Sequence, residues 1–338
     1  MAPGESFPEA RLYAGRRVLV VGGTGFLGSN LTAALAGAGA DILSLSRGAS
    51  KDSDSARDGV VQAIGDIGDD RVARRVVSDR DVIFNVAGRS GAAASNAAPL
   101  ADLHENARAN LVLLEACRSE SPNARLVFAS TRLVYGPTRI LPVRESAIVR
   151  PLSLYAVHKL AVEHYLRIYA ESHGLSSVAL RITNPYGPGA RKSQPTYNIV
   201  NWFIDLALNN EVLPIYGDGR QMRDYIHVDD VSRAFLLAGL ADRPGSQVLN
   251  IGSSVGVSFR GMAELVVRAA KSGQTQFVPW PPDARTVETG SFVADIAKAK
   301  RSIGWYPSIS FETGIANAVI GRGASRRGHD DIMVMARQ

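Results

Sequence analysis

Short apolar runs alternate with longer amphipathic segments through the first half of the chain. The runs are rich in valine, leucine and isoleucine, which is typical of strands buried on both faces of a sheet. The predicted strands are Arg17–Val21, Ile42–Leu45, Val60–Ile64, Val82–Val86, Leu126–Ala129 and Ser177–Ile182. The segments between them predict helices over Phe26–Ala38, Asp70–Val77, Pro99–Arg118 and Leu152–His173. Strands that alternate with helices form right-handed βαβ units, so the pattern predicts an α/β fold with an open, doubly wound parallel sheet.

After Thr183 the chain carries more turn residues and shorter periodic segments. Asn184–Gly189 and Ile215–Gly219 are predicted turns, because both are dense in Gly, Pro, Asn or Asp. The other predicted elements are helices over Tyr197–Asn209 and Asp229–Leu240 and a strand over Gln247–Ile251. This change predicts a main domain over 16–183 plus about 229–256, and a smaller mixed α/β lobe over 184–228 plus about 257–320. Residues 1–15 and 321–338 are predicted to be flexible termini.

Composition narrows the class of protein. The 338 residues include 38 Lys and Arg against 32 Asp and Glu, a net charge of +6 that is scattered along the chain and does not predict nucleic-acid binding. The single cysteine, Cys117, excludes an internal disulfide and a cysteine-based metal site. No apolar run approaches the roughly 20 residues of a membrane helix. We therefore expect a cytoplasmic protein with no membrane segment and no metal.

A glycine-rich turn joins the first predicted strand to the first predicted helix, with the sequence Gly22-Gly23-Thr24-Gly25-Phe26-Leu27-Gly28. Glycine there permits a tight turn and lets the backbone approach a pyrophosphate, which the helix N-terminus then faces with free N–H groups. In this strand–turn–helix context the motif predicts dinucleotide binding.

The residues after the second and third predicted strands bear on which dinucleotide binds. An acidic residue after the second strand would accept hydrogen bonds from the adenosine ribose and favour NAD. This chain instead has Ser46 and Arg47. Arg47 can pair with a 2′-phosphate and Ser46 does not repel one, so NADP is slightly favoured; a solvated Arg47 beside NAD is the alternative. Asp66 is either an acceptor for the adenine amino group or a turn residue.

Tyr155 and Lys159 lie four residues apart and therefore on one face of the same predicted helix. A phenol titrates near 10, and a neighbouring ammonium favours the phenolate that acts as a base. Ser130 and Thr131 follow the strand Leu126–Ala129, at the carboxyl edge where α/β sheets bind ligands. Hydroxyl, phenol and ammonium together beside a cofactor predict a hydride-transfer site, whereas His158 faces elsewhere and is predicted to be structural.

Together with further motifs, these features resemble the extended short-chain dehydrogenase/reductase superfamily, and within it the NAD-dependent epimerase/dehydratase family of nucleotide-sugar enzymes. The resemblance covers about residues 16–319. The motifs are Gly22-x-x-Gly25-x-x-Gly28, Gly65-Asp66, Asn85-Val86-Ala87-Gly88, Asn106 with Asn110, Ser130-Thr131-x-x-Val134-Tyr135-Gly136, Tyr155-x-x-x-Lys159, Arg181-x-x-Asn184-x-Tyr186-Gly187-Pro188 and Tyr216-Gly217-Asp218-Gly219-x-x-x-Arg223-Asp224. The resemblance implies a Rossmann-type domain for NAD or NADP and a smaller lobe for a nucleoside-diphosphate sugar.

The resemblance also implies a role for each matching residue. Tyr155 is the implied acid/base, Thr131 its hydroxyl partner, and Lys159 the ribose contact that favours the phenolate. Implied cofactor contacts are Gly22, Thr24, Gly25, Phe26, Leu27, Gly28, Ser46, Arg47, Asp66, Ile67, Val86, Ala87, Gly88, Asn106, Tyr155 and Lys159. Implied substrate contacts are Arg89, Ser130, Thr131, Arg132, Asn184, Asn201, Arg223 and Arg285, the last two as a diphosphate clamp. For Arg223 the alternative is an ion pair with Asp224 or Asp229.

The two residues after Thr131 indicate which reaction of the family this chain catalyses. Dehydratases of the family carry an acidic pair there and decarboxylating relatives a glutamate, whereas this chain has Arg132 and Leu133. Neither acts as a carboxylate acid or base, so the resemblance favours epimerisation, with C4 as the preferred position. The alternatives are an NADPH-dependent reductase of keto sugars and, less favoured, a 4,6-dehydratase or a non-catalytic NADP sensor.

The family also implies a homodimer. The helices predicted around Pro99–Arg118 and Leu152–His173 carry apolar positions at Leu111, Leu114, Leu160, Tyr165 and Leu166. We expect these helices to pack against their copies in a twofold dimer.

Overall fold

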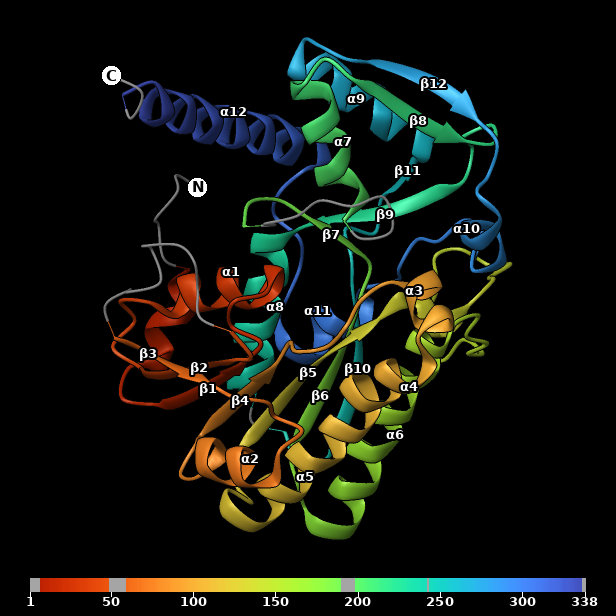
Figure 1. Cartoon of the computed structure of the whole chain (residues 1–338). Helices are drawn as coiled ribbons and strands as arrows, with labels where there is room; N and C mark the ends of the chain where they lie inside the picture. Colours follow the sequence, from red (N-terminus) through yellow and green to blue (C-terminus); the bar gives the residue numbers. More distant parts are fainter. Residues whose placement is uncertain (1–6, 49–58, 190–197, 242, 336–338) are drawn as a thin grey trace.

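The computed structural model describes residues 7–48, 59–189, 198–241 and 243–335, with backbone alone over 324–335. Figure 1 shows a larger lobe built on a long sheet and a smaller lobe above it that contains much of the second half of the chain. The chain returns to the large sheet late, because β10 (Ser246–Ile251) pairs with β6 (Ser177–Ile182).

The large sheet has seven strands in the order β10-β6-β5-β4-β1-β2-β3, and every neighbouring pair is parallel. Its other strands are β1 (Arg17–Val21), β2 (Asp41–Ser46), β3 (Val60–Ile64), β4 (Val82–Asn85) and β5 (Arg125–Thr131). Strand order reverses at β1, so the crossover helices cover both faces. The predicted doubly wound α/β fold is confirmed.

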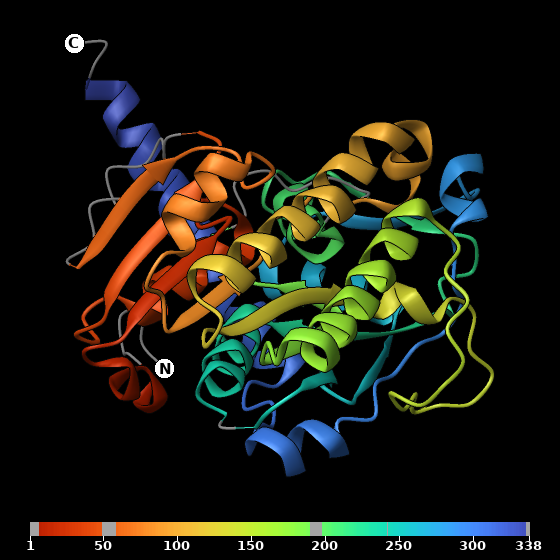
Figure 2. The same ribbon diagram turned by 90° about the horizontal axis from the view of Figure 1, so that it is seen from below.

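Helices cover the two faces of this sheet (Figure 2). Each face has its own apolar core. One face packs against α1 (Phe26–Leu35), α8 (Val228–Leu240) and α11 (Ala297–Ile303), with Phe84 and Phe235 at its centre. The other face packs against α2 (Asp70–Val77), α5 (Ala109–Glu120) and α6 (Leu154–His173). Because both faces of the inner strands are buried, these strands carry the largely apolar runs from which they were predicted, whereas the edge strand β3 is mostly exposed.

The smaller lobe holds two short sheets and its own apolar core around Phe203, Tyr225 and Met262. One sheet has the order β11-β9-β7 and mixes antiparallel and parallel pairs, and the other pairs β8 with β12. The strands are β7 (Asn184–Tyr186), β8 (Val212–Tyr216), β9 (Met222–His227), β11 (Gly256–Ser258) and β12 (Gln274–Val278). The helices are α7 (Ile199–Leu208), α9 (Phe259–Ala270), α10 (Pro282–Thr286) and α12 (Phe311–Met335).

Several predicted elements differ from the structure. The helix predicted over Pro99–Arg118 is divided into α4 (Pro99–Leu103), a π-helical turn η3 (His104–Arg108) and α5, and a further helix α3 (Ala92–Ala97) precedes it. The turn predicted over Asn184–Gly189 begins as strand β7, and the turn predicted from Ile215 begins inside β8. In each of these two turns, pairing with a distant strand overrides local turn chemistry.

The predicted flexible N-terminus is wrong for the described residues 7–15. They form a 3-10 helix η1 (Pro8–Tyr13), and the buried Tyr13 hydroxyl donates to Leu236 O at 2.7 Å. The predicted C-terminal flexible segment begins inside α12, whose backbone is helical as far as Met335. Two side chains predicted for a dimer surface, Leu114 and Leu166, instead lie in the core beside the sheet.

Within the described residues, no helix is long and apolar enough to span a membrane. That part of the chain also contains no group of three His, Cys, Asp or Glu side chains that could hold a metal ion. Cys117 is buried, and burial raises the pKa of its thiol to about 12.

Candidate active site

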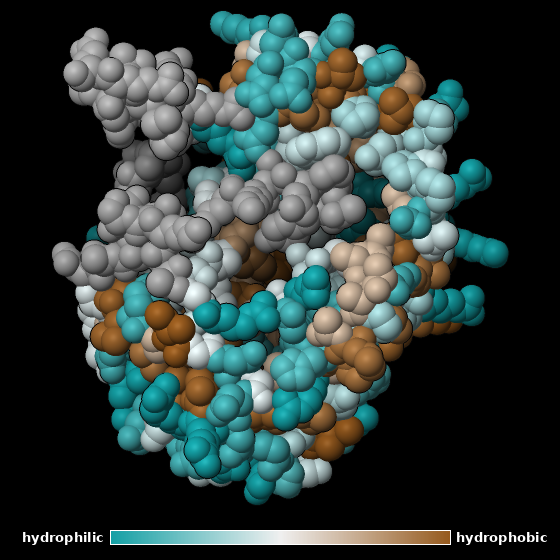
Figure 3. All heavy atoms as spheres, in the orientation of Figure 1, coloured by the Kyte–Doolittle hydropathy of each residue, from teal (hydrophilic) through white to brown (hydrophobic). Residues whose placement is uncertain are grey.

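A cavity of about 670 Å³ lies where the carboxyl ends of the large sheet meet the smaller lobe. Figure 3 shows a hollow between the lobes with hydrophobic side chains inside it. The predicted site residues that line this cavity are Gly25, Phe26, Leu27, Val86, Ala87, Gly88, Arg89, Ser130, Thr131, Arg132, Tyr155, Lys159, Asn184 and Arg223. The fold therefore brings residues from the glycine turn, the hydride-transfer motif and the smaller lobe to one cavity.

The glycine turn has the shape that close approach of a phosphate requires. Gly22 has φ +91° and lies against the Ala87 backbone, so a side chain there would be strained and crowded. Gly25 is the N-cap of α1 and has no side-chain cap, which leaves the first N–H groups of α1 facing the cavity. These features fit the pyrophosphate of a dinucleotide.

The stability of a Gly28 variant tests whether the glycine turn is closely packed. A Cβ added at Gly28 would overlap the Gly22 carbonyl, which is backbone and cannot rotate away. We expect Gly28→Ala to lower the free energy of unfolding by about 1–3 kcal/mol, measured by urea denaturation. Gly48→Ala is the control, because no described residue lies within 4 Å of its added Cβ. Equal stability of the two variants would contradict the packing argument.

The residues predicted around the adenosine lie outside the cavity lining. Ser46 Oγ accepts from Thr24 N at 3.0 Å and so ties β2 to the glycine turn. Arg47 forms an ion pair with Glu105 of η3 at 3.2 Å, a partner that the sequence did not indicate. Asp66 Oδ1 accepts from Gly68 N at 2.8 Å, as in an Asx turn, and Ile67 lies in the core.

A buried polar network that the sequence did not predict lies beside Gly88. Asp102 Oδ1 lies 2.7 Å from His158 Nδ1, and Asp102 Oδ2 accepts from Asn106 Nδ2 at 3.0 Å. Asn106 Nδ2 also donates to Arg89 O at 2.9 Å, which holds the loop after β4. Asn106 Oδ1 is buried without a partner among the described residues, and a Cβ added at Gly88 would overlap it. The unpaired Asn106 Oδ1, which Gly88 leaves uncovered because it has no side chain, could accept a hydrogen bond from a hydroxyl group of a bound ribose.

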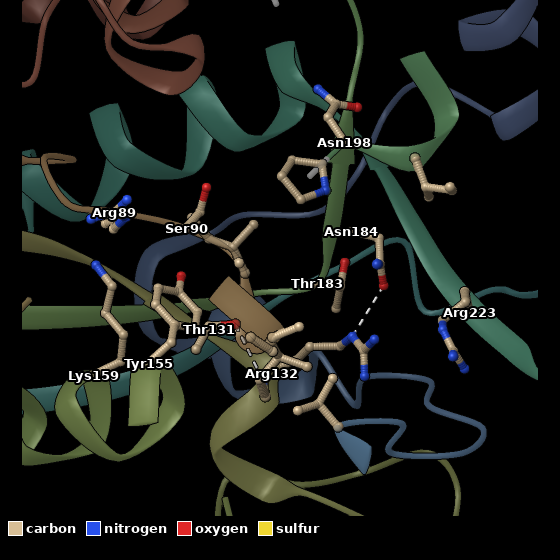
Figure 4. Close-up of a pocket in the computed structure, with 18 of the residues that line it drawn as sticks. Arg89, Ser90, Thr131, Arg132, Tyr155, Lys159, Thr183, Asn184, Asn198 and Arg223 are labelled. Atoms are coloured by element: carbon tan, nitrogen blue, oxygen red, sulfur yellow. Dashed lines mark hydrogen bonds between the residues drawn. The ribbon is translucent and has the colours of Figure 1, made fainter. Parts of the chain in front are cut away.

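The hydroxyl, phenol and ammonium of the predicted triad face the cavity from two elements (Figure 4). Thr131 ends β5, and its Oγ1 accepts from Leu133 N at 3.2 Å. Tyr155 and Lys159 lie on α6, which begins where the Ser153 hydroxyl caps Ala156 N. Lys159 Nζ donates to Ala129 O at 2.9 Å and lies 5.8 Å from the centre of the Tyr155 ring. Burial lowers the pKa of Lys159 to about 8, so its charge is largely retained at pH 7.

Three predicted substrate contacts are arranged differently in the structure. Ser130 Oγ donates to Glu163 Oε1 at 2.5 Å, and Glu163 forms a buried ion pair with Arg181. The Asn201 amide binds both backbone groups of Gly187 and is absent from the cavity lining. Arg285 is exposed on α10 and is also absent from the lining. The side chains of Ser130 and Asn201 therefore hold the fold in this state.

Arg132, Asn184 and Arg223 form a polar group on the side of the cavity away from Lys159 (Figure 4). Arg132 Nε donates to Asn184 Oδ1 at 3.1 Å, and Arg132 Nη1 donates to Thr289 Oγ1 at 2.9 Å. Arg223 pairs with Glu288 at 2.5 and 2.7 Å, so neither Asp224 nor Asp229 is its partner. Asp224 instead accepts backbone N–H groups of Ser253, Ser254 and Ala294.

An aromatic wall completes the cavity and was missed by sequence reasoning. Tyr216 lies at the end of β8, with its ring centre 5.4 Å from that of Trp280 and 6.2 Å from that of Phe259. Gln221 Nε2 and both amide atoms of Asn198 are buried without partners among the described residues, and both side chains line the cavity. The signal was a pair of parallel strands, β8 and β12, with aromatic residues at or just beyond their carboxyl ends.

The chain is similar to a known protein family and to its members. A model described as the NAD dependent epimerase/dehydratase family matches residues 18–252. A UDP-glucose 4-epimerase of Azospirillum brasilense is 32% identical over 325 residues, which cover 91% of this chain and 92% of that protein.

Solved structures are similar over nearly the same length. MoeE5 in complex with UDP-glucuronic acid and NAD has a TM-score of 0.82 and 29% identity, with 91% of this chain and 99% of that chain covered. A UDP-glucose 4-epimerase of Thermus thermophilus in complex with NAD has a TM-score of 0.80 and 31% identity, with 90% and 97% covered.

Proposed function

The chain belongs to the NAD dependent epimerase/dehydratase family, and from this premise we propose that it is a nucleotide-sugar epimerase that inverts C4 of a UDP-sugar. The observation that carries the proposal is the meeting of Thr131, Tyr155 and Lys159 with the glycine turn in one cavity. The large lobe would hold the cofactor and the smaller lobe the nucleotide. Relatives named UDP-glucose 4-epimerase support the choice of a UDP-sugar as substrate and of C4 as the inverted carbon.

In this mechanism Tyr155 exchanges a proton with the sugar. The phenolate of Tyr155 accepts the proton of the C4 hydroxyl, and the Thr131 hydroxyl holds that oxygen in place. The protonated Lys159 stabilises the phenolate across the 5.8 Å from its Nζ to the ring centre. A nicotinamide bound beside the triad supplies hydride acceptance and return. The resulting 4-keto sugar then rotates in the site so that its other face meets the nicotinamide. Tyr155 returns the proton to the C4 oxygen, which completes the inversion.

The cofactor would be held by residues that fit it. The N-terminal N–H groups of α1 at Phe26 and Leu27 would bind the pyrophosphate. Lys159 and the unpaired Asn106 Oδ1 would bind the nicotinamide ribose below Gly88. The nucleotide base of the substrate would stack in the aromatic wall of Tyr216, Trp280 and Phe259, because bases and aromatic rings stack well.

Proton NMR of UDP-glucose, UDP-galactose and their uronic-acid forms, incubated with the purified protein, tests this function. Inversion at C4 without net consumption of added dinucleotide is expected. Net oxidation or reduction of the added dinucleotide would favour the alternative, an NADPH-dependent reductase of keto sugars. No conversion of any of these sugars would contradict the proposal.

The ion pair between Arg47 and Glu105 bears on cofactor choice. Glu105 Oε2 lies 3.2 Å from Arg47 Nη2, so a 2′-phosphate bound at Arg47 would lie beside a carboxylate that repels it. In place of the slight preference for NADP expected from the sequence, NAD(H) should therefore bind at least as tightly as NADP(H). Glu105→Gln removes that repulsion and should shift the affinity ratio toward NADP(H) by about tenfold, or about 1.4 kcal/mol.

Calorimetric titration with both dinucleotides measures this ratio. Glu120→Gln is the matched control. Glu120 is the last residue of α5, the helix that follows η3, and like Glu105 it pairs with an arginine, in this case Arg74. A wild-type preference for NADP(H) above tenfold would contradict the proposed role of Glu105.

We also propose that the protein is a twofold homodimer formed through α4 and α6. Val157 and Ile168 are 42% and 45% exposed and lie eleven residues apart, which is three turns of α6 on one face. Leu100 and Leu103 of the neighbouring α4 are also exposed. Apolar side chains on two packed helices are typical of an interface between copies.

Light scattering at micromolar concentration tests the dimer. The wild type should have the mass of two chains, and Val157→Glu with Ile168→Glu should reduce it to one. Val61→Glu is the control, because Val61 is 59% exposed on the distant edge strand β3. A monomeric wild type would rule the interface out.

A further inference from the structure

Among the described residues, Arg132 is a buried cation that has only neutral partners. It lies next to Thr131, is 6% exposed, and donates to the amide oxygen of Asn184 and the hydroxyl of Thr289. Its guanidinium lies 5.3 Å from the centre of the Phe292 ring. Burial, and then the charge of Arg223, lower the pKa of Arg132, although an arginine stays protonated at neutral pH.

The nearby carboxylates are already engaged by other groups. Glu288 forms a two-oxygen ion pair with Arg223. Asp224 accepts from three backbone N–H groups and from the Ser253 hydroxyl. Within the described chain, no carboxylate lies within ion-pair distance of Arg132. Burying an uncompensated cation is costly, and a bound anion would offset that cost.

The position of Arg132 indicates which part of a ligand it meets. Figure 4 shows its side chain extending from beside Thr131 toward Asn184, on the way to Arg223. A nucleotide sugar whose reacting C4 lies at Thr131 must span this space to reach its diphosphate. Of the two ring carbons next to C4, only C5 carries a substituent that can be a carboxylate, so the group on C5 is the part of the sugar that can offset the charge of Arg132. A planar guanidinium matches a carboxylate there through paired hydrogen bonds.

We infer that Arg132 selects a sugar with a carboxylate at C6, so that the substrate is a nucleoside-diphosphate uronic acid. This inference rests on the proposed function and names its substrate class. A neutral hydroxymethyl group at the same place accepts a hydrogen bond but leaves the buried charge without a counter-ion. The diphosphate, which is common to both kinds of sugar, does not discriminate between them.

Calorimetry on the protein as purified, with UDP-glucuronic acid, UDP-glucose and UDP, tests the inference. The wild type should bind UDP-glucuronic acid about 10- to 100-fold more tightly than UDP-glucose. Arg132→Met should abolish this ratio and leave UDP affinity within about threefold of the wild type. Arg132→Lys should keep part of the ratio, because it keeps the charge and loses the fork. Arg301→Met, at an exposed position on α11, should change nothing.

The outcomes separate this inference from the function beneath it. Equal wild-type affinity for the two sugars overturns the uronic-acid inference and leaves a nucleotide-sugar enzyme in place. A loss of UDP affinity in Arg132→Met as large as the loss for the uronic acid also overturns it, because Arg132 would then bind the diphosphate. The wild-type comparison decides the question even if Arg132→Met fails to fold. Failure of all three ligands to bind overturns the proposed function as well.

Discussion

Replacing Tyr155 with phenylalanine should lower turnover by about 10²–10⁴-fold, the usual cost of removing a general acid/base. The substitution removes one hydroxyl from a side chain that lines the cavity and leaves the ring in place. The fold and the affinity for dinucleotide should therefore be unchanged. The measurement is C4 inversion by NMR under saturating sugar, with calorimetry for cofactor binding.

Two further variants separate chemistry from general damage. Thr131→Val should lower turnover less than Tyr155→Phe, because it removes an orienting hydroxyl and leaves the proton carrier in place. Tyr165→Phe is the matched control, since Tyr165 lies on the same helix and outside the cavity lining. Undiminished turnover in Tyr155→Phe would refute the role of Tyr155 as acid/base.

Replacing Lys159 with methionine should reduce turnover strongly and in a pH-dependent way. Burial lowers the pKa of Lys159 to about 8, so its positive charge is present below that pH and lost above it. The charge favours the Tyr155 phenolate below pH 8, where the variant should lag the wild type most. In the variant, the acid limb of the pH–rate profile should move upward by about 1–3 pH units. Above pH 8, where the wild type also loses this charge, the gap between the two profiles should narrow, although the ribose contact of Lys159 is lost at every pH.

The control for this experiment keeps the charge at the same position. Lys159→Arg retains a cation, so its acid limb should stay closer to that of the wild type even if turnover falls. A Lys159→Met profile with the wild-type midpoint would show that the ammonium does not act on the titrating group. Thermal unfolding of each variant distinguishes a kinetic effect from loss of the fold.

Features determined by local geometry were predictable from the sequence. The strands β1 and β6 have the predicted bounds because strands that are almost wholly buried must be largely apolar. The edge strand β3, which is mostly exposed, also has the predicted bounds, because its valine-rich run favours a strand. The meeting of Tyr155 and Lys159 on one face follows from the 3.6-residue period of α6. The glycine turn was recognisable because its backbone geometry and close packing restrict the residue types that fit. For the helix pair, and for Gly28 against Gly22 in the turn, the relevant partners lie within a few residues in the sequence.

The tertiary structure alone decided which charges are compensated. Arg132 reaches Thr289 across 157 residues, and Arg47 meets Glu105 through a π-helical turn that no periodic pattern announced. Ser130, adjacent to Thr131, donates to Glu163 because the buried ion pair of Glu163 with Arg181 leaves an acceptor to satisfy. The sequence by itself determined the fold class and the placement of Tyr155 and Lys159 on one helix face, since both depend on short-range periodicity. The proposed selection of cofactor and sugar depends on electrostatics between distant segments, which only the folded chain brings together.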